Sequence, residues 1–382
     1  MFQSALPKQL SIAGLVFLAT AVTVPKAGAE DSLEVTAFSA NLDALSGQEA
    51  KSASDPARQL GLVGGRLEST RGARIEGRNV NASSFALRFS GSSAEKSAAY
   101  ETKNLLAPEK ERRTRRTAVW FGGDVTLDSA RAEDPRLAAV YTNGIAFGAD
   151  TRLGRDLLVG NAVGMAFDRT GIAAEGSLQT RSFSDTLYAS LTTAPDTYLD
   201  VMAGGSHTAF RNDLGVETFS SAERSATQAF GLARFSRNFE RKRLRLRPYG
   251  QARYLHTRLS GYSVEGNDTY SVKPYSSDSY ELTLGLRGET SAKTRAGKVA
   301  PNAVLEVSRA FKRDSGSVVS SMEGAEEVAA PATDHSSRLS ARTGINWTIT
   351  DRASVSGAYS VSSTIGDFNA EQQVSARFKL KF

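Results

Sequence analysis

Large apolar residues recur at every second position through the C-terminal two thirds of the chain. In Tyr280–Leu286 (YELTLGL), tyrosine and leucine alternate with glutamate, threonine and glycine. In Ala353–Val361 (ASVSGAYSV), apolar residues alternate mainly with serine and glycine. Successive side chains of a β-strand point to opposite faces, so a period of two predicts strands with one greasy face and one small, hydroxylic or charged face.

Twelve such segments follow one another after Thr117, most of them 12–16 residues long. Strands of globular proteins average ~5–6 residues, whereas a tilted strand needs ~9–11 residues to cross the hydrocarbon of a membrane. The alternation is least regular near Arg234 in the sixth segment and near Glu306 and Arg309 in the ninth. The predicted strands cover residues 117–129, 138–151, 156–169, 178–193, 197–211, 225–240, 244–258, 279–292, 299–312, 336–350, 352–363 and 371–382.

Short and long connections alternate along this series. The short ones are 151–156, 193–197, 240–243, 292–298 and 350–352, and the longer ones are 129–137, 170–177, 212–224, 259–278, 312–335 and 364–370. In a stack of hairpins this order places all tight turns at one end, as in outer-membrane barrels with short periplasmic turns and long external loops. A soluble β-sandwich gives no reason for short and long connections to alternate in this way. We therefore predict an all-β fold, a twelve-stranded antiparallel transmembrane β-barrel.

The last segment ends on an aromatic residue. Because every backbone N–H and C=O must be paired inside lipid, we expect this strand to pair with the first and close the barrel. Phe382 would then lie at the membrane boundary, where aromatic residues form girdles. An ordinary edge strand with outward charges is the alternative. The apolar positions of the last strand are Val374, Ala376, Phe378, Leu380 and Phe382.

Charged residues occupy many positions of the polar face, which a barrel turns toward its lumen. Such a wall can pair with a plug helix or can simply keep the interior hydrated, and the sequence favours neither. Twelve strands leave room for about one helix, because eight-stranded barrels are filled and sixteen-stranded ones leave a channel. The predicted lumen charges are Arg245, Arg247, Arg253, Glu281, Arg287, Arg342, Arg377, Lys379 and Lys381.

The pattern of residues at the N-terminus is typical of an export signal. Lys8 precedes the apolar stretch Leu10–Val24, and small residues at Ala27 and Ala29 predict a signal peptide over residues 1–29 with cleavage after Ala29. A membrane anchor is the alternative, but the stretch is short for a span of ~20 residues. Removal of its two lysines lowers the formal net charge from +6 to +4, which gives no reason to expect nucleic-acid binding. The 382 residues contain no cysteine.

Residues 30–92 would form a short passenger or linker, partly disordered, in which Ser84–Phe89 could be one strand. Residues 93–116 would supply a pore helix over Ser93–Leu106, ended by Pro108, and a basic tether over Glu109–Arg116. The tether is either a solvated charge run or a contact to anionic groups near the membrane.

No catalytic, cofactor or metal site emerges from the remaining motifs. His207 follows Ser206 and has Asp200 upstream, but adjacent residues of a strand point to opposite faces and cannot form a nucleophile–base pair. His256 falls near the outer end of a predicted strand, and His335 falls in a long loop. We expect a protein that is not an enzyme and has no cofactor. A hydrolase at the barrel rim is the weaker alternative.

Residues 117–382 resemble the C-terminal translocator β-barrel domain of autotransporters, the type V secretion family. The resemblance rests on the order and spacing of stretches such as VWFGGDVTLD (Val119–Asp128), GIAFGADTRLGRDLLVGNAVGMAFDRT (Gly144–Thr170) and LRPYGQARYLHTRLSGYSVEG (Leu246–Gly266). It implies a bacterial outer-membrane barrel, inserted by the barrel-assembly machinery with periplasmic chaperones, in which the last strand is the assembly signal. We expect the barrel to be a monomer.

The resemblance also implies export or surface display of the chain's own N-terminal segment, and in some members passenger cleavage at a pore asparagine, for which Asn104 lies in the right region. Autotransporter passengers usually span several hundred residues, whereas residues 30–92 are few. An adhesin or structural barrel that acts through the loops 259–278 and 312–335 is therefore the main alternative.

Overall fold

The computed structural model describes fourteen stretches of the chain, and all structural statements concern these. They are residues 29–74, 82–90, 116–128, 139–172, 176–213, 221–241, 244–264, 270–294, 297–314, 318–322, 325–329, 333–348, 353–365 and 370–380. Residues 1–28 of the signal peptide predicted over residues 1–29, the helix candidate Ser93–Leu106 with Asn104, and most of the basic tether lie outside them.

Each of the twelve predicted segments forms a strand, so the predicted strand series is confirmed. The strands are 11 to 19 residues long and run antiparallel to their neighbours along the chain, with register shifts at Thr126/Leu127 of β2 and Thr192/Ala194 of β5. They are β2 (Thr117–Asp128), β3 (Ala139–Leu153), β4 (Leu157–Ile172), β5 (Gly176–Ala194), β6 (Thr197–Asp213), β7 (Ala222–Arg237) continued by β8 (Phe239–Arg241), β9 (Leu244–Leu259), β12 (Tyr275–Thr290), β14 (Gly297–Asp314), β17 (Thr333–Thr348), β18 (Ala353–Thr364) and β19 (Ala370–Leu380).

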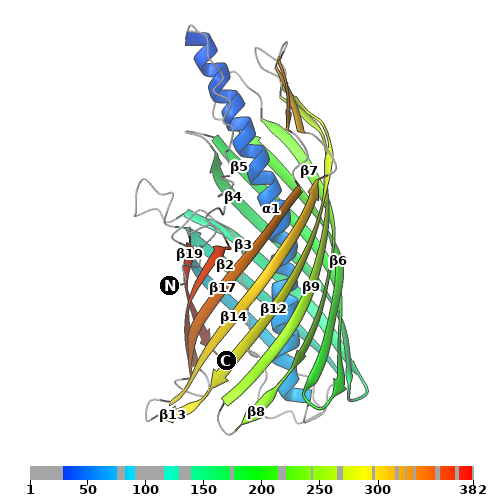
Figure 1. Ribbon diagram of the computed structural model, residues 1–382, viewed down its shortest axis with the longest axis vertical. Helices are drawn as coiled ribbons and strands as arrows, with labels where there is room; N and C mark the ends of the chain where they lie inside the picture. Colours follow the sequence, from blue (N-terminus) through cyan, green and yellow to red (C-terminus); the bar gives the residue numbers. More distant parts are fainter. Residues whose placement is uncertain are drawn as a thin grey trace, which may run out of the picture.

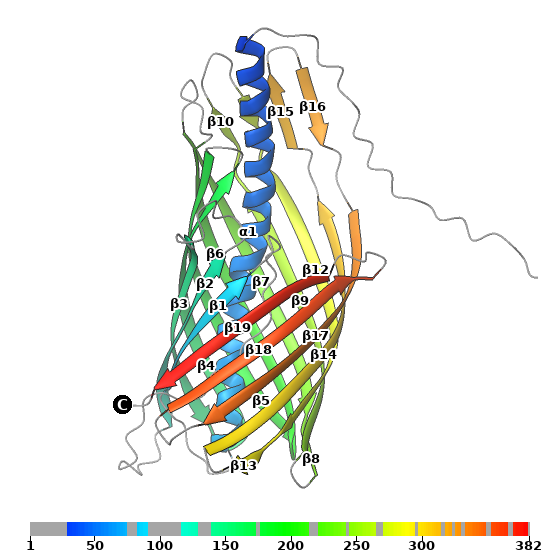
Figure 2. The ribbon, with the colours of Figure 1, turned by 90° about the vertical axis from the view of Figure 1, so that its left-hand side faces the viewer.

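An additional strand, β1 (Ala82–Ser90), completes the sheet (Figure 2). It pairs in parallel with β2 along its whole length and antiparallel with β19 over Leu87–Ser90. Since β9 also pairs with β12, the pairings run in a closed circuit of thirteen strands. The expectation that the last strand pairs with the first strand of the predicted series is therefore wrong: β1 lies between β2 and β19 and provides hydrogen-bond partners for both edges.

The two ends of the barrel differ. Tight turns join β3 to β4 and β5 to β6, where Gly154 (φ 75°) and Asp196 (φ 59°) take the left-handed conformation that a reversal of this kind requires. At the opposite end, two connections build a separate four-stranded sheet from β10 (Tyr262–Val264), β11 (Tyr270–Val272), β15 (Val318–Met322) and β16 (Ala325–Ala329). Figures 1 and 2 show this sheet rising above the barrel.

Strand extension shortens some of the loops predicted at this end. β4 continues to Ile172 and β5 begins at Gly176, so only three residues connect them instead of the predicted 170–177. His335 belongs to β17, where it pairs in register with Phe311, and not to a loop. The alternation of short and long connections is thus less strict than the sequence indicates, because hydrogen bonding continues beyond the length needed to cross a bilayer.

The apolar face of the strands points outward. Leu284 in the middle of β12 is 72% exposed, and its neighbour Thr283 on the inner face is 7% exposed. The inner face of β5 carries the buried small hydroxyls of Ser182, Ser184 and Thr186. Other exposed large hydrophobic residues are Val119, Phe147, Leu153, Met165, Phe167, Phe183, Leu187, Leu191, Val201, Phe235, Phe239, Leu244, Leu246, Tyr280, Leu282, Leu286, Leu305, Val307, Leu339, Ile345, Trp347, Tyr359 and Ile365. A greasy exterior around a polar interior is the arrangement of a barrel in lipid.

A single long helix, α1 (Ala29–Arg74), runs through the barrel (Figure 1). It enters from the end with the four-stranded sheet and ends near the tight turns, while its first turns stand above the barrel wall. A helix in the lumen was predicted, but from residues 93–106. It comes instead from the segment expected to be passenger or linker. No described helix is long and apolar enough to span a membrane.

We predict that Leu284→Arg will lower the stability of the folded barrel in lipid vesicles by about 2–4 kcal/mol, because it places a charge in the hydrocarbon. Urea unfolding of the vesicle-bound protein, followed by tryptophan fluorescence, measures the difference. Ser308→Arg is the matched control, because Ser308 pairs in register with the inward-facing Thr283. Equal effects of the two substitutions would contradict the outward orientation.

Candidate functional site

The middle of α1 packs against an apolar part of the lumen wall. Leu60, Leu62, Val63 and Leu67 are almost fully buried, each 5% exposed or less. They contact Trp120, Leu158, Tyr188, Met202, Phe230, Leu232 and Leu255 of the wall, together with Ala146 and Ala162. Burial of a side chain of this size stabilises by about 1.5–3 kcal/mol. The helix is therefore held by a packed core and is not a loose occupant of a wet pore.

Glycines in the wall make room for these lumen aromatics. The ring of Tyr188 lies over Gly160, where an added Cβ would approach the ring to within 2.4 Å. A side chain at Gly160 would clash with the phenol ring and displace it from its place on the wall. The small residues of the inward face, which the sequence pattern already indicated, thus accommodate large neighbours on adjacent strands.

Toward the tight turns, Arg66 of α1 forms a buried bidentate ion pair with Asp150 of β3. Its Nε and Nη2 donate to the two carboxylate oxygens at 2.7 and 2.9 Å. Tyr188 donates to the same carboxylate at 3.0 Å, and its hydroxyl accepts a hydrogen bond from Trp120 Nε1 at 2.7 Å. The aspartate is 2% exposed and the arginine 1%, so this network is shielded from solvent.

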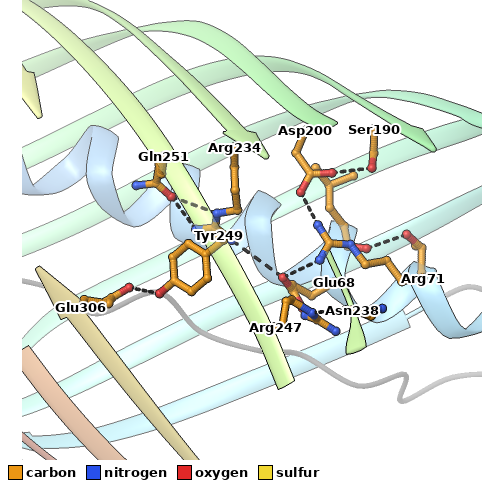
Figure 3. Close-up of polar contacts among 12 residues, drawn as sticks. Glu68, Arg71, Ser190, Asp200, Arg234, Asn238, Arg247, Tyr249, Gln251 and Glu306 are labelled. Atoms are coloured by element: carbon orange, nitrogen blue, oxygen red, sulfur yellow. Dashed lines mark hydrogen bonds and ion pairs between the residues drawn. The ribbon is translucent and has the colours of Figure 1, made fainter. Parts of the chain in front are cut away.

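One helical turn further, Arg71 and Glu68 contact the wall through a second network (Figure 3). Arg71 pairs with Asp200 of β6, which also accepts a hydrogen bond from Ser190. The Arg71 guanidinium lies 4.6 Å from the ring centroid of Tyr198. These contacts place the C-terminal part of α1 against β5 and β6.

Glu68 lies between three arginines in this second network. It pairs with Arg247 of β9, lies 2.9 Å from Arg71 of its own helix and 3.8 Å from Arg234 of β7. Figure 3 shows Arg234 extended between Glu68 and Gln251, which accepts its hydrogen bonds at 2.6 and 3.0 Å. A carboxylate with this many partners fixes the rotation of the helix about its axis. If the helix rotated, Glu68 would move away from Arg234 and Arg247 and leave both arginines without this carboxylate.

Near the opposite mouth, α1 is bound by a third set of polar contacts. Gln48 donates to Asn212 at 3.0 Å and accepts from Arg224 at 2.8 Å. Arg224 lies 5.4 Å from the ring centroids of both Tyr262 and Tyr275, so the base of the external sheet orients it. Lys51 pairs with Asp168, and Glu49 pairs with Lys312 of β14.

The polar contacts at the two ends match the thickness of a bilayer. Gln48 and Arg71 are separated by about 34 Å along the helix at 1.5 Å per residue, and the hydrocarbon core is ~30 Å thick. Polar groups therefore fasten both ends of a stretch about as long as a bilayer is thick, and the apolar contacts of Leu60, Leu62 and Val63 lie between these ends.

Pro56 interrupts the hydrogen-bond ladder of α1, and the wall compensates. Proline has no N–H, so the carbonyl of Ser52 loses its partner four residues on. Gln228 of β7 donates to that carbonyl at 3.0 Å. The amide oxygen of Gln228 accepts in turn from Ser206 and from Thr208. A helix-breaking residue is thus tolerated because a wall side chain takes the place of the missing donor.

Most of the helix lies against one side of the lumen, and Glu49 near the outer mouth reaches β14 through its pair with Lys312. The helix packs on β2 to β7 and on β9. On the other side of the lumen wall, polar side chains pair with one another. Glu306 of β14 accepts from Tyr249 and, at 3.2 Å, from Ser340 of β17.

The residues predicted as lumen charges differ in their partners and in their place along the barrel. Arg247 contacts Glu68 of the helix, and Arg253 pairs with Glu281 at 2.6 Å. Arg245 pairs with Glu240 at 3.3 Å at the exposed turn end. Arg287 and Arg342 are half-buried, Arg377 and Lys379 belong to β19, and Lys381 lies outside the described residues.

The positions proposed as the assembly signal lie at alternate residues of the last strand. Val374 is in register with Phe89 of β1, and Phe378 with Val355 of β18. Ala376 and Leu380 share this strand, and Phe382 lies just outside the described residues. Their role in assembly stays a prediction.

Sequence reasoning did not find the contacts that position the helix: Arg66, Glu68 and Arg71 with Asp150 and Asp200. Asp150 and Asp200 are carboxylates close to tight turns, at positions that alternate with apolar residues. This placement was the only sequence signal that pointed to them.

No described Ser-His-Asp constellation exists at Ser206, because His207 is exposed while Asp200 is buried against Arg71. His256 contacts Asp278 at 2.9 Å on the barrel rim. The described residues hold no group of three or more potential metal ligands from His, Cys, Asp and Glu.

A closed sheet that is apolar outside and polar inside, with a helix of the same chain fastened along its lumen, defines a transmembrane β-barrel with an internal N-terminal helix. The family model described as autotransporter beta-domain matches residues 120–360. The chain belongs to this family. It is thus an outer-membrane barrel of the autotransporter type, which serves the export of its own passenger, and the predicted fold class, family and membrane are confirmed.

Two solved structures resemble the chain in overall form. The translocator domain of the autotransporter NalP from Neisseria meningitidis is 15% identical, with 63% of this chain and 80% of that one covered and a TM-score of 0.45. The beta domain of the Bordetella autotransporter BrkA is 18% identical, with 63% and 91% covered and a TM-score of 0.45. No curated protein matches the sequence.

We predict that Gln228→Leu will lower stability by about 1–3 kcal/mol, because it leaves the Ser52 carbonyl buried without a donor. In a Pro56→Ala background the loss should be smaller, since the alanine N–H can bond that carbonyl. Thermal unfolding of the four proteins of this double-mutant cycle gives the coupling energy. Gln251→Leu is the control, because Gln251 accepts only from Arg234, and its effect should add to that of Pro56→Ala. Additive effects at Gln228 would contradict the compensation.

Proposed function

We propose that α1 both closes the lumen and holds the exported N-terminal segment at the outer mouth of the barrel. The observation that carries this proposal is the direction of α1. Its N-terminal turns project beyond the end that bears the long connections, and Arg66, Glu68 and Arg71 bind the wall near the tight turns (Figure 1). Residues before Leu45 therefore face the exterior if the tight turns face the periplasm, as in outer-membrane barrels.

The contacts of α1 favour a helix that stays in place after export. Buried pairs such as Arg66–Asp150 add little net stability compared with an apolar core, but removal of one partner leaves an uncompensated charge that costs about 3–5 kcal/mol. Sliding of the helix would separate several such pairs together. The helix then acts as a tether for whatever precedes it and as a plug against diffusion of solutes.

The proposal requires no reaction. We propose that the barrel acts passively, without nucleotide, metal or catalytic residue, and that its folding into lipid drives display of the segment. Pairing of backbone groups inside hydrocarbon favours the closed barrel strongly over any open intermediate. The barrel domain would comprise residues 117–382, and the strand β1 of the preceding segment would complete its wall.

We further propose that a signal peptide over residues 1–29 directs export across the inner membrane, and that the barrel-assembly machinery and periplasmic chaperones receive the unfolded chain. The alternation of Val374, Ala376, Phe378, Leu380 and Phe382 supports recognition of the last strand as an edge onto which another strand can add.

A second function has support from the external sheet. The connections 260–274 and 315–332 do not form two separate loops but pair through β11 and β15. Tyr262 and Tyr275 at its base are buried against Arg224. Burial raises the pKa of the Tyr262 hydroxyl to about 12, so it stays neutral at physiological pH. A rigid external sheet of this kind could serve adhesion or ligand contact.

Single cysteines test the display of the N-terminal segment, because the chain has none of its own. We predict that Ser39→Cys in the projecting part of α1 reacts in intact cells with a maleimide that does not cross membranes. Ser52→Cys, buried in the lumen, should stay unlabelled, and Thr193→Cys at the tight-turn end should react only after the cells are permeabilised. If Ser39→Cys is never labelled from outside, the hypothesis of surface display is contradicted, and adhesion through the external sheet becomes the favoured function.

A further inference from the structure

The two ends of the barrel carry opposite charge. Between consecutive strands at the tight-turn end, the connections contain seven basic and four acidic residues, whereas the connections at the opposite end contain three basic and ten acidic ones. The helix and the lumen do not account for this difference, because the arginines that contact α1 are paired with carboxylates. The excess of basic residues at the tight turns is thus a feature of the sequence that the contacts of α1 do not use.

The outer face of β7 and β8 ends in alternating aromatic and basic residues. Phe235, Arg237, Phe239 and Arg241 occupy every second position, and all four are exposed, while Ser236 between them is buried. The Arg237 guanidinium lies 5.0 Å from the ring centroid of Phe239. The same face on β9 presents Leu244 and Leu246, in register with Arg241 and Phe239.

Neither arginine of this row has a carboxylate partner among the described residues. Glu240 lies between them in sequence but belongs to the opposite face of the strand, where it pairs with Arg245. This contrasts with Arg66, Arg71 and Arg247, each of which is paired inside the lumen. An arginine on an apolar outer face that has no carboxylate partner among the described residues has its hydrogen-bond donors available to a ligand in the membrane boundary; for Arg237 this holds although Asp196 lies in the adjacent turn.

The adjacent hairpin extends the positive charge. β9 pairs with β12 up to Leu244↔Thr290, so the turn after β12 lies beside the turn before β9. This neighbouring turn contributes Lys293, which is in register with Lys298. Figure 1 shows the labelled strands β8 and β13 at the same end of the barrel.

We propose that Arg237 and Arg241 form a binding site for the phosphate of an anionic phospholipid at the inner boundary of the barrel. The acyl chains would lie along Phe235, Leu244 and Leu246, and the guanidinium groups would extend toward the headgroup, as long basic side chains do at interfaces. Guanidinium groups bind phosphate oxygens through paired hydrogen bonds. The proposal rests on the embedding of the barrel in a membrane but not on the role of α1 in display.

A lipid fits this site better than a free phosphate ion. A free ion would use the two guanidinium groups but not the exposed phenylalanine and leucine side chains on the same face. The basic turn beside the site, which carries Lys293, favours a lipid with net negative charge over a zwitterionic one, because each basic residue near an anionic surface adds attraction.

Native mass spectrometry of the full barrel in detergent tests the site with dioleoyl phosphatidylglycerol and, in parallel, dioleoyl phosphatidylcholine. We expect the unmodified protein to retain phosphatidylglycerol preferentially. Arg237→Gln with Arg241→Gln should weaken that binding roughly 25-fold, or about fivefold for each arginine. Arg211→Gln is the control: Arg211 is exposed at the other end of the barrel and opposite Glu223 in register, and its loss should change nothing.

Three results would overturn the proposal. The first is unchanged phosphatidylglycerol binding in the double variant, with heat-modifiable migration on gels showing that the barrel is folded. The second is equal retention of phosphatidylcholine by the unmodified protein, which would indicate an apolar surface without a headgroup site. The third is displacement of the lipid by excess inorganic phosphate, which would indicate a site for free anions. Because Ser39 labelling does not depend on these arginines, failure here and failure of surface display are distinguishable.

Discussion

The pairing of backbone hydrogen-bonding groups in hydrocarbon is the constraint on which the rest of this structure depends. An open sheet would leave the edges of β2 and β19 unpaired in lipid, where each unsatisfied group costs several kcal/mol. The chain meets the constraint with β1, which is parallel to β2 and antiparallel to β19. Once the sheet is closed, side-chain alternation determines that greasy residues face lipid and polar residues face the lumen.

The filled lumen creates a second requirement, because polar side chains taken from water need partners. Arg66, Glu68 and Arg71 find theirs on β3, β6 and β9, and Gln228 supplies the donor that Pro56 lacks. Buried pairs of this kind specify geometry more than they add stability. A helix displaced by one turn would lose several of them at once, so the wall selects one position for α1 and thereby fixes which residues stand outside the mouth.

The strands could be predicted from the sequence because a period of two survives over 12 or more residues, and the tight turns follow from the breaks between them. The helix was placed wrongly for a physical reason. Pro56 and the glycines at 61, 64 and 65 resemble helix breakers, and a helix surrounded by a mixed polar and apolar wall shows no single greasy stripe. The partners of Arg66 and Arg71 could not be predicted either, because Asp150 and Asp200 are brought to them only by closure of the barrel.

Amide hydrogen exchange of the barrel in lipid nanodiscs tests most directly whether α1 is a permanent part of the lumen. The contacts described predict that amides of Leu45–Arg71 exchange as slowly as those of β5 and β6, over hours, while amides preceding Leu45 exchange much faster. Exchange of the whole helix within seconds, with the strands still protected, would show that the helix leaves the barrel readily and would contradict the account of a fastened plug.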